Sequence, residues 1–416
     1  MGTRFGAFQI DSNVFVKKKR SIGKALTMKI HLISAARPNF MKIAPLYHAL
    51  KKEPWAEPLI VHTGQHYDLN MSDVFFQDLG LPEPDLHLGV GSGTHAEQSG
   101  QVMIAYEKVL LESRPDLVIV VGDVNSTMAC TIAAVKISYK SAGSKSNPIG
   151  PTETLSSADL DRPCVAHLEA GLRSFDRTMP EEINRLVTDA LADILWTPSP
   201  DADDNLIREG VARQKIQRVG NIMIDSLEML RSSIKKQGAY SEMGLNPGEY
   251  GLVTLHRPSN VDDPRVLTTL CHTLIRISQR MPLVFPVHPR TRKNMENLGL
   301  MPLLEKTDNL TISGPINYIR FMNLVFNCRF ALTDSGGLQE ETTYLGIPCL
   351  TLRSNTERPI TIDQGTNRLC VLDDFEKHVD DLLSKKSSHD CKIDLWDGRT
   401  ADRVVESIKT YFHLAL

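Results

Sequence analysis

The sequence lacks the signals that define several common protein classes. Its seven cysteines are scattered and odd in number, with no CxxC pair, so they indicate neither a disulfide framework nor a zinc site. Lys and Arg total 47 against 50 Asp and Glu, a formal net charge of -3, which argues against nucleic acid as a partner. The longest purely aliphatic run, residues 117–121, is far too short to cross a bilayer. These absences favour a cytoplasmic protein with no membrane partner.

A dinucleotide-binding fingerprint is also missing. The first apolar segment is followed by SAARPNFMK, residues 34–42, which stands where the fingerprint would be but lacks G-x-G-x-x-G. The sequence therefore indicates no NAD site, and we expect neither a cofactor nor a bound metal. Arg37 and Lys42 in this stretch are suited to hold anionic or carbonyl oxygens at a helix start. A solvated Arg and a surface Lys fit the pattern equally well.

What is present is a repeated alternation of strand and helix patterns. Apolar runs typical of buried strands occur at residues 30–34, 59–63, 117–121 and 164–168, and again at 250–255, 283–287, 310–312, 330–333 and 349–352. Helical patterns stand between them, at 40–50, 94–112, 125–137 and 181–191, then near 264–280, 291–298, 318–327 and 338–345. The alternation predicts an α/β protein with two Rossmann-like domains facing across a cleft.

The expected domains follow from breaks in this alternation. Residues 1–27 carry six Lys and Arg and one acid, and we expect a disordered basic extension there. The first domain is expected over 28–220, interrupted by an inserted surface loop at 138–161 that is rich in Ser, Gly, Pro and Lys. A second domain is expected over 221–399, with the final helix, 400–416, returning to the first.

Charge is concentrated in HLEAGLRSFDRTMPEEINR, residues 167–185, directly after a predicted strand. Its PEE segment suits a helix start, because Pro is tolerated in the first turn and acids are stabilised at the positive end of the helix dipole. Ligands of open α/β sheets bind at the carboxyl ends of strands, so Glu169 and Glu181 are candidate catalytic acids. A surface cluster of ion pairs is the alternative interpretation.

Further polar residues follow other predicted strands. Asp123 comes after the most hydrophobic run and is suited to act as a base or to orient a sugar hydroxyl, whereas capping the next helix is its simpler role. His256 and His288 each follow a predicted strand of the second half. Arg257 comes directly after the first, and Pro289 and Arg290 come after the second. A His paired with an Arg suits an anionic group and can donate to a leaving oxygen.

A phosphate-binding pattern opens the helix predicted near 338–345. Gly336 and Gly337 expose backbone N–H groups to an anion, and Ser335 adds a hydroxyl. Glu341 lies one to two turns further and is suited to bind both hydroxyls of a ribose, while Arg358 follows the next strand. Acids from the first half would thus face a diphosphate cradle from the second, which predicts chemistry on a nucleotide sugar.

Nine motifs carry a family resemblance and occur in one order between residues 36 and 361: ARPNFMK, HTGQH, GDVNST, HLEAGLRS, MPEEINR, LHRPSNVD, PVHPRTR, TDSGGLQEE and NTERPIT. As a set they closely resemble the non-hydrolysing UDP-N-acetylglucosamine 2-epimerases, whose two-Rossmann-domain architecture is known as GT-B. The resemblance covers about residues 28 to 416. It implies a homodimer that interconverts UDP-N-acetylglucosamine and UDP-N-acetylmannosamine for cell-surface polysaccharide, by anti elimination of UDP to 2-acetamidoglucal and syn re-addition.

The resemblance also assigns roles to individual positions. It implies catalytic roles for Asp123, Glu169, Glu181 and His256. It implies substrate or UDP contacts for Arg37, Lys42, Arg185, Ser335, Gly336, Gly337, Glu341 and Arg358. Two alternatives stay open: a 2-epimerase acting on a related UDP-diacetamido sugar or uronate, and a GT-B glycosyltransferase that uses a UDP-sugar. An inert UDP-sugar-binding protein is a third, and the complete acid set argues against it.

Overall fold

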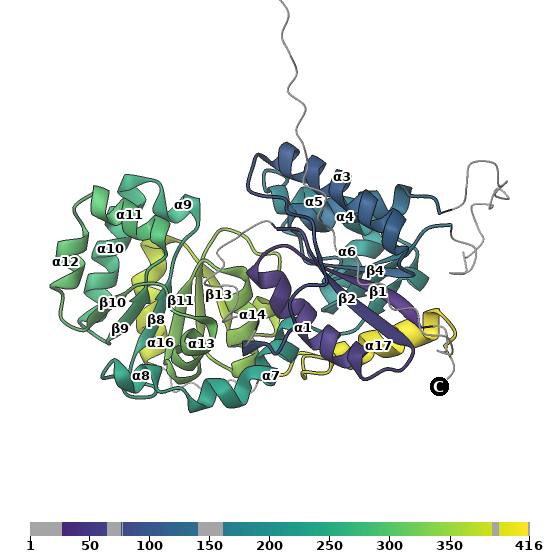
Figure 1. Cartoon of the computed structure of the whole chain (residues 1–416). Coiled ribbons are helices and arrows are strands. Elements are labelled where there is room, and N and C mark those ends of the chain that lie inside the picture. Colours follow the sequence, from purple (N-terminus) through teal and green to yellow (C-terminus); the bar gives the residue numbers. More distant parts are fainter. Residues whose placement is uncertain (1–26, 65–75, 77, 140–160, 385–390, 415–416) are drawn as a thin grey trace, which may run out of the picture.

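The computed structural model describes residues 27–64, 76, 78–139, 161–384 and 391–414. These residues form two lobes, each built on a parallel sheet with helices on its faces (Figure 1). Apart from Thr27, the basic extension expected at 1–27 lies outside the described residues, and so does the interior of the expected loop at 138–161. No helix in the described ranges is long and apolar enough to span a bilayer.

The first sheet has seven strands in the order β3-β2-β1-β4-β5-β6-β7. The strands are β1 Met28–Ser34, β2 Ala56–His62, β3 Leu86–His87, β4 Leu117–Val121, β5 Cys164–Leu168, β6 Ile194–Thr197 and β7 Ile216–Arg218. The helices are α1 Arg37–Lys51, α3 His95–Ser113, α4 Asn125–Lys136, α5 Pro180–Leu191 and α6 Pro200–Arg208. Every residue of β4 and β5 is buried, as expected for parallel strands covered on both faces.

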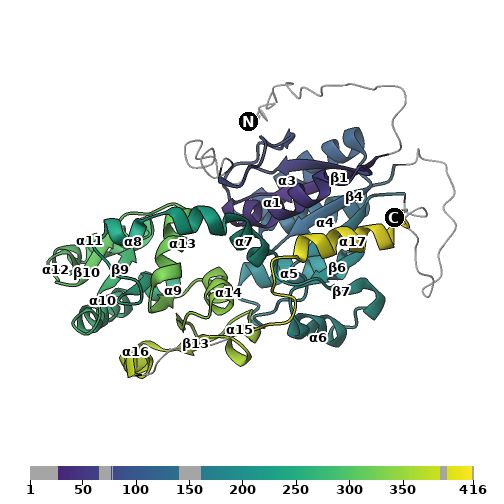
Figure 2. The same cartoon turned by 90° about the horizontal axis from the view of Figure 1, so that it is seen from below.

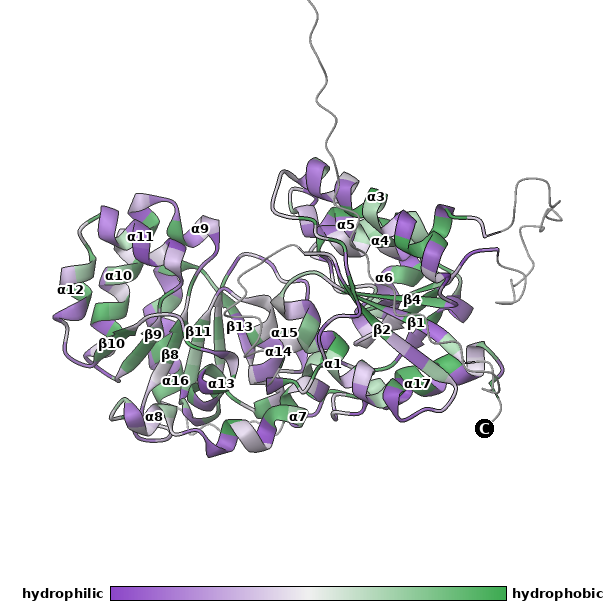
Figure 3. Ribbon diagram, in the orientation of Figure 1, coloured by the Kyte–Doolittle hydropathy of each residue, from purple (hydrophilic) through white to green (hydrophobic). Residues whose placement is uncertain are grey.

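The second sheet has six strands in the order β10-β9-β8-β11-β12-β13. The strands are β8 Gly251–Thr254, β9 Leu283–Pro286, β10 Leu310–Ser313, β11 Phe330–Thr333, β12 Cys349–Leu352 and β13 Asn367–Cys370. The helices of this lobe are α8 Ala239–Glu242, α9 Pro258–Val261, α10 Pro264–Ser278, α11 Pro289–Asn297, α12 Met301–Glu305, α13 Tyr318–Asn327, α14 Gly336–Leu345, α15 Ile360–Asp363 and α16 Phe375–Ser384. The central strands β4 and β8 are among the apolar, green parts of the ribbon (Figure 3).

The strand orders explain where a ligand can bind. Each sheet winds outward from a central pair, β1 and β4 in the first and β8 and β11 in the second. Such reversal points leave a crevice beyond the carboxyl ends of the strands. The two facing sheets confirm the prediction of an α/β protein with two Rossmann-like domains, the GT-B fold.

Two helices connect the lobes. Helix α7, Ile222–Lys236, packs on α1 and α17 on one side and on α13 and α14 on the other. Helix α17, Thr400–Tyr411, lies against α1, and Ser407 accepts a hydrogen bond of 2.7 Å from the indole of Trp196 in β6 (Figure 2). Asp225 of α7 accepts the first backbone N–H groups of α17 at 3.0 and 2.8 Å. We propose the domain boundaries at Gly220 and near Arg399, where the chain passes between the lobes.

The ends of the expected insertion are joined. Tyr139 donates its backbone N–H to the carbonyl of Asp161 at 2.9 Å, and the Ser138 hydroxyl hydrogen-bonds the Asp161 carboxylate. The two ends of this segment therefore lie side by side. An insertion with closed ends adds little loop-closure entropy to the fold.

Candidate active site

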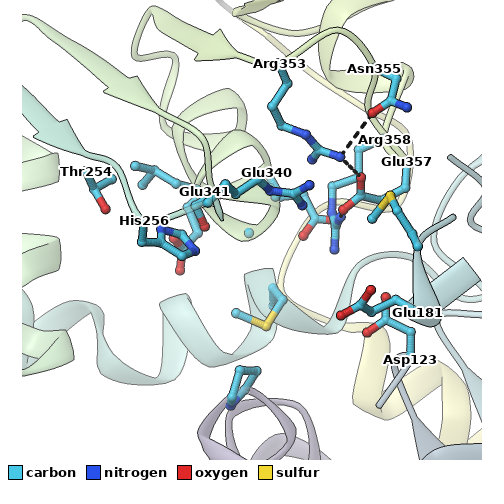
Figure 4. A pocket seen from close by; sticks show the side chains of 18 of the residues that line it. Asp123, Glu181, Thr254, His256, Glu340, Glu341, Arg353, Asn355, Glu357 and Arg358 are labelled. Carbon is cyan, nitrogen blue, oxygen red and sulfur yellow. Dashed lines mark hydrogen bonds and ion pairs between the residues drawn. The ribbon is translucent and has the colours of Figure 1, made fainter. Parts of the chain in front are cut away.

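A cavity of about 1230 Å³ lies between the carboxyl ends of the two sheets, and Figure 4 shows part of its lining. Both lobes contribute side chains to it. The predicted site residues that line it are Lys42, Asp123, Glu181, Arg185, His256, Ser335, Gly336, Gly337, Glu341 and Arg358. Glu169 is not among the lining residues, and the side chain of Arg37, at the start of α1, lies outside the described part of the structure.

Glu169 lies behind the cavity wall and reaches it through Lys42. It directly follows β5 with a φ of 71°, a conformation that is unusual for a residue other than glycine. Lys42 Nζ donates to Glu169 Oε2 at 2.5 Å. The other oxygen, Oε1, is buried and has no hydrogen-bond partner among the described residues. Such strain and lost hydrogen bonding persist chiefly where function requires them.

Gly122 makes room for this ion pair. Its φ is +66°, and a Cβ atom built there would lie 2.7 Å from Lys42 Nζ. Any larger residue would push Lys42 away from Glu169. Glycine is therefore favoured at this position of the GDVNST motif for two reasons: Lys42 lies too close for a side chain, and the backbone is left-handed.

Asp123 is held by Arg185 of α5. One guanidinium nitrogen of Arg185 contacts Asp123 Oδ2, and another donates to Glu182 Oε2 at 2.7 Å. Glu182 also accepts the backbone N–H groups of Ser174 and Phe175 at 3.0 and 2.9 Å. Burial acts to raise the pKa of Glu182, but these hydrogen bonds and Arg185 outweigh it, so that the pKa is lowered. Glu182 was not predicted as a site residue, yet it orients the arginine that orients Asp123.

Asp123 does not cap helix α4, which was the simpler role expected from its position. Helix α4 begins after Val124, and this N-cap residue makes no side-chain capping hydrogen bond. The Asp123 side chain remains 31% exposed toward the cavity. Glu181, in the first turn of α5, is exposed and lies beside Asp123 (Figure 4). The two carboxylates thus face the same space from different elements.

A buried His–Asp pair fixes the turns that carry these acids. His167 Nδ1 lies 2.6 Å from Asp189 Oδ1, and its Nε2 lies 2.9 Å from the carbonyl oxygen of Gly122. Asp189 also contacts Arg173 at 2.7 Å and accepts the Gly171 N–H at 3.0 Å. Burial acts to raise the pKa of Asp189, but His167 and Arg173 outweigh it and lower the pKa. The charged HLEAGLR stretch therefore contains a buried support as well as a candidate acid.

His256, two residues beyond β8, is oriented by Asp334. Its Nδ1 lies 3.0 Å from Asp334 Oδ1, and Asp334 also accepts the backbone N–H groups of His256 and Arg257 at 3.0 and 2.8 Å. Burial acts to raise the pKa of Asp334, but the hydrogen bond and charge of His256 lower it overall. Because Nδ1 is engaged, Nε2 is the nitrogen of His256 that can reach a ligand. His256 is 41% exposed, whereas Asp334 is fully buried.

The first turn of α14 forms an anion-binding surface. Ser335 precedes the helix, and it lines the cavity together with Gly336 and Gly337. A Cβ atom on Gly336 would lie 2.8 Å from both Arg358 and Glu357, so glycine allows Arg358 to approach the helix start. The unpaired N–H groups and the dipole of a ten-residue helix favour a bound phosphate here.

Arg358 keeps its charge although its side chain is only 11% exposed. It donates to Glu357 at 2.6 Å, and its Nε lies 3.0 Å from Glu340. Burial acts to lower the pKa of Arg358, but Glu340 and Glu357 outweigh it and raise the pKa.

Glu357 also pairs with Arg353 at 2.8 Å. Burial acts to raise the pKa of Glu357, and the two arginines lower it overall. Arg353, Glu357 and Glu340 were not predicted as site residues, although two of them stand within quoted motifs.

Glu341 is a buried acid of the second lobe that is paired with Tyr318. Burial raises its pKa to about 7, and the charge of Glu340 adds to this, while Tyr318 opposes it. The Tyr318 hydroxyl donates to Glu341 Oε1 at 2.6 Å. Glu341 therefore changes charge near neutral pH in the ligand-free protein.

Two facing Rossmann-like domains with a charged cavity between them define a protein of the GT-B class. A family model described as UDP-N-acetylglucosamine 2-epimerase matches residues 48–142 and 156–409. The chain therefore belongs to the UDP-N-acetylglucosamine 2-epimerase family, and it is an epimerase that acts on a nucleotide sugar.

Similar proteins agree with this membership. A UDP-N-acetylglucosamine 2-epimerase of Methanocaldococcus jannaschii is 39% identical over 394 residues, covering 92% of this chain and 99% of the relative. A UDP-2,3-diacetamido-2,3-dideoxy-D-glucuronate 2-epimerase of Pseudomonas aeruginosa is 39% identical over 346 residues, covering 82% and 88%. The crystal structure of a M. jannaschii UDP-GlcNAc 2-epimerase in complex with UDP-GlcNAc and UDP is similar at a TM-score of 0.78, with 37% identity over 92% of this chain and all of that one.

Proposed function

We propose that the protein interconverts UDP-N-acetylglucosamine and UDP-N-acetylmannosamine by inversion at C2, with no nicotinamide cofactor. The observation that carries the proposal is one cavity with two chemically different sides. The start of α14 and Arg358 offer N–H groups and positive charge to a diphosphate, whereas Asp123 and Glu181 offer carboxylates opposite them. A sugar joined to that diphosphate would lie between a leaving-group site and candidate bases.

The proposed chemistry is an elimination followed by an addition. A carboxylate removes the C2 proton, the C1–O bond breaks, and its electron pair leaves with UDP, which creates the C1–C2 double bond of 2-acetamidoglucal. A proton then reaches the opposite face of C2, and the UDP oxygen adds back to C1. One proton leaves and one returns, so there is no net oxidation. Dipoles and cations fixed at the diphosphate stabilise the charge that develops there.

The acids suit divided roles because their surroundings differ. Asp123 is paired with Arg185, Glu169 is buried against Lys42, and Glu181 lies in an open helix turn. Carboxylates in unlike environments can serve as acid and base in one reaction. His256, held through Nδ1, is suited to donate to the departing diphosphate. We assign Ser335 and Glu341 to binding of the uridine diphosphate, together with Gly336, Gly337, Arg37, Lys42, Arg185 and Arg358.

The family resemblance supports the wider setting that we propose. In it the enzyme is a cytoplasmic homodimer that supplies N-acetylmannosamine-type sugars for cell-surface polysaccharide. Dimerisation can be checked by light scattering and the compartment by fractionation.

A related uronate is the second candidate substrate. The P. aeruginosa relative, named for a diacetamido-glucuronate, is as similar in identity, 39%, as the M. jannaschii epimerase. The cavity also holds Arg257 and Arg353, which are cations beyond Arg358. Burial, and then the charge of Arg353, lowers the pKa of Arg257. A further cation such as Arg257 would suit a carboxylate on the sugar as well as a diphosphate.

Proton NMR in heavy water tests the proposal. The protein is incubated with UDP-N-acetylglucosamine alone and, in parallel, with the diacetamido-uronate, without any acceptor. We expect the N-acetylmannosamine epimer to form with deuterium at C2. An epimer that forms without deuterium uptake would contradict the elimination, and turnover of the uronate alone would identify the second candidate as the substrate.

A further inference from the structure

Glu340 occupies the junction between the diphosphate site and the connection of the two lobes. It precedes Glu341 on α14, is 2% exposed and lines the cavity (Figure 4). Its Oε1 accepts a hydrogen bond of 2.9 Å from Asn221 Nδ2, and Arg358 Nε lies 3.0 Å from the same oxygen. One carboxylate oxygen therefore links the candidate diphosphate arginine to the residue that begins α7.

Asn221 is fixed at the point where the chain passes between the lobes. Its Oδ1 accepts the N–H of Met223 at 2.9 Å and so caps α7, while its Nδ2 reaches Glu340. The preceding Gly220 has a φ of +99°, and a Cβ atom there would lie 2.2 Å from the carbonyl oxygen of Leu395. Because α7 packs on helices of both lobes, a shift at Asn221 would change how the lobes approach each other.

The carboxyl group of Glu340 is influenced by charges of the first lobe, and its second oxygen has no partner among the described residues. Oε2 is buried and has no hydrogen-bond partner among the described residues, like Oε1 of Glu169. Burial raises the pKa of Glu340, the charge of Glu169 raises it further, and Arg358 and Lys42 oppose them. Buried carboxylate oxygens without partners destabilise a fold, so a cluster of this kind needs a reason.

We propose that Glu340 is a positioning residue that couples Arg358 to the linker at Asn221, and thereby sets the approach of the diphosphate site to the Lys42–Glu169 pair. The inference rests on the proposed function and assigns no proton transfer to Glu340. A diphosphate that draws Arg358 toward it also moves Glu340, its ion-pair partner, and Asn221, which is hydrogen-bonded to Glu340. The carboxylates of the first lobe therefore reach C2 of the sugar only when the diphosphate is bound.

Two variants distinguish a positioning role of Glu340 from a purely structural one. Asn221→Ser keeps a hydroxyl to cap α7 but loses the donor to Glu340, and Glu340→Gln keeps the shape but removes the charge. Misplacement of reacting groups lowers turnover more than binding, so we expect kcat to fall on the order of 10-fold or more. The Kd for UDP, measured by calorimetry, should change by less than about threefold, because the residues that contact UDP remain. The double variant should be no slower than Glu340→Gln alone, since both interrupt one connection.

Asn323→Ser is the matched control. Asn323 donates a buried hydrogen bond to the carbonyl of Ile234 and a partly buried one to the carbonyl of Gln237, near the other end of α7. It should lower the melting temperature without changing the ratio of kcat to UDP affinity. If Asn221→Ser and Glu340→Gln leave kcat unchanged, or lower kcat and UDP affinity by the same factor, the inference is overturned. Failure of the proposed function is seen separately, as wild-type protein that does not epimerise the UDP-sugar.

Discussion

The candidate acids differ most in how their oxygens are partnered. Glu169 has one oxygen on Lys42 and one without a described partner, Asp123 has Arg185, and Glu181 is exposed. A base that must take a proton from carbon gains from an oxygen that no donor already occupies. The geometry therefore singles out Glu169 and Glu181 as the acids with accepting capacity to spare.

Removing these carboxylates should abolish most turnover. We expect Asp123→Asn, Glu169→Gln and Glu181→Gln each to lower kcat on the order of 10²-fold or more, the scale of a lost acid–base group. Glu181→Gln should keep the wild-type melting temperature because the side chain is exposed, whereas Glu169→Gln should lower it because Lys42 loses its buried partner. Glu107→Gln, on the exposed face of α3, is the control. Near wild-type rates in all three variants would disprove the site.

Glu341 should make stability depend on pH. Its folded-state pKa is about 7 against an ordinary value of 4.5, so between these values the folded protein holds a proton that the unfolded chain releases. Stability from this group is thus present below pH 4.5 and is lost as the pH rises through 7, by on the order of 3 kcal/mol. Glu341→Gln lacks this loss, so its melting temperature relative to wild type should rise by a few degrees between pH 5 and 8.

A second variant checks the cause of that pH dependence. Tyr318→Phe removes the hydrogen bond that opposes the raised pKa of Glu341. Its pH-dependent loss of stability should therefore shift to higher pH than that of wild type. A difference between wild type and Glu341→Gln that stays constant from pH 5 to 8 would show that Glu341 does not titrate in this range.

At the scale of elements, the turn between β7 and α7 is tightly constrained. Gly220 combines a left-handed φ with backbone contact to Leu395, whereas Gly210, with a φ of +86°, has nothing within 4 Å of an added Cβ. Gly210→Ala should cost about 1 kcal/mol from its conformation alone. Gly220→Ala should cost at least about twice as much, because the segment around Leu395 must also move. Thermal unfolding of the pair measures this, and equal shifts would show that the close contact is unimportant.

At the scale of the whole molecule, the cavity is complete only when both lobes contribute. The candidate diphosphate site belongs to the second lobe, and Asp123 and Lys42 belong to the first. We expect UDP to draw the lobes together, which would exclude water from the glucal intermediate. The turn at Gly220 and the chain entering α17 are the expected hinges.

Small-angle scattering tests this closure. The radius of gyration should decrease at saturating UDP, with binding confirmed by calorimetry. Glu341→Ala should weaken UDP binding and leave the unliganded radius unchanged. A radius that does not respond to bound UDP would favour a preformed cleft over domain closure.

The local pattern of the sequence was enough to predict the central strands of both sheets. The bounds of β4, β5, β11 and β12 agree with the predicted apolar runs, because strands buried on both faces read as unbroken apolar segments. The strands β3, β6, β7 and β13 were missed. They are two to four residues long, and β3, β7 and β13 are partly polar, so their periodicity cannot be distinguished from that of loops.

The sequence by itself determined which residue types follow each strand, and so the kind of chemistry and the family. Only the tertiary structure decided which of those residues meet. Lys42 and Glu169 are 127 positions apart, and Asn221 and Glu340 are 119 apart, so no local pattern records their contacts. Likewise, nothing in the PEE motif tells the exposed Glu181 from the buried Glu182. Burial and pairing arise when separate elements pack, because each charge must then find a partner or face the cavity.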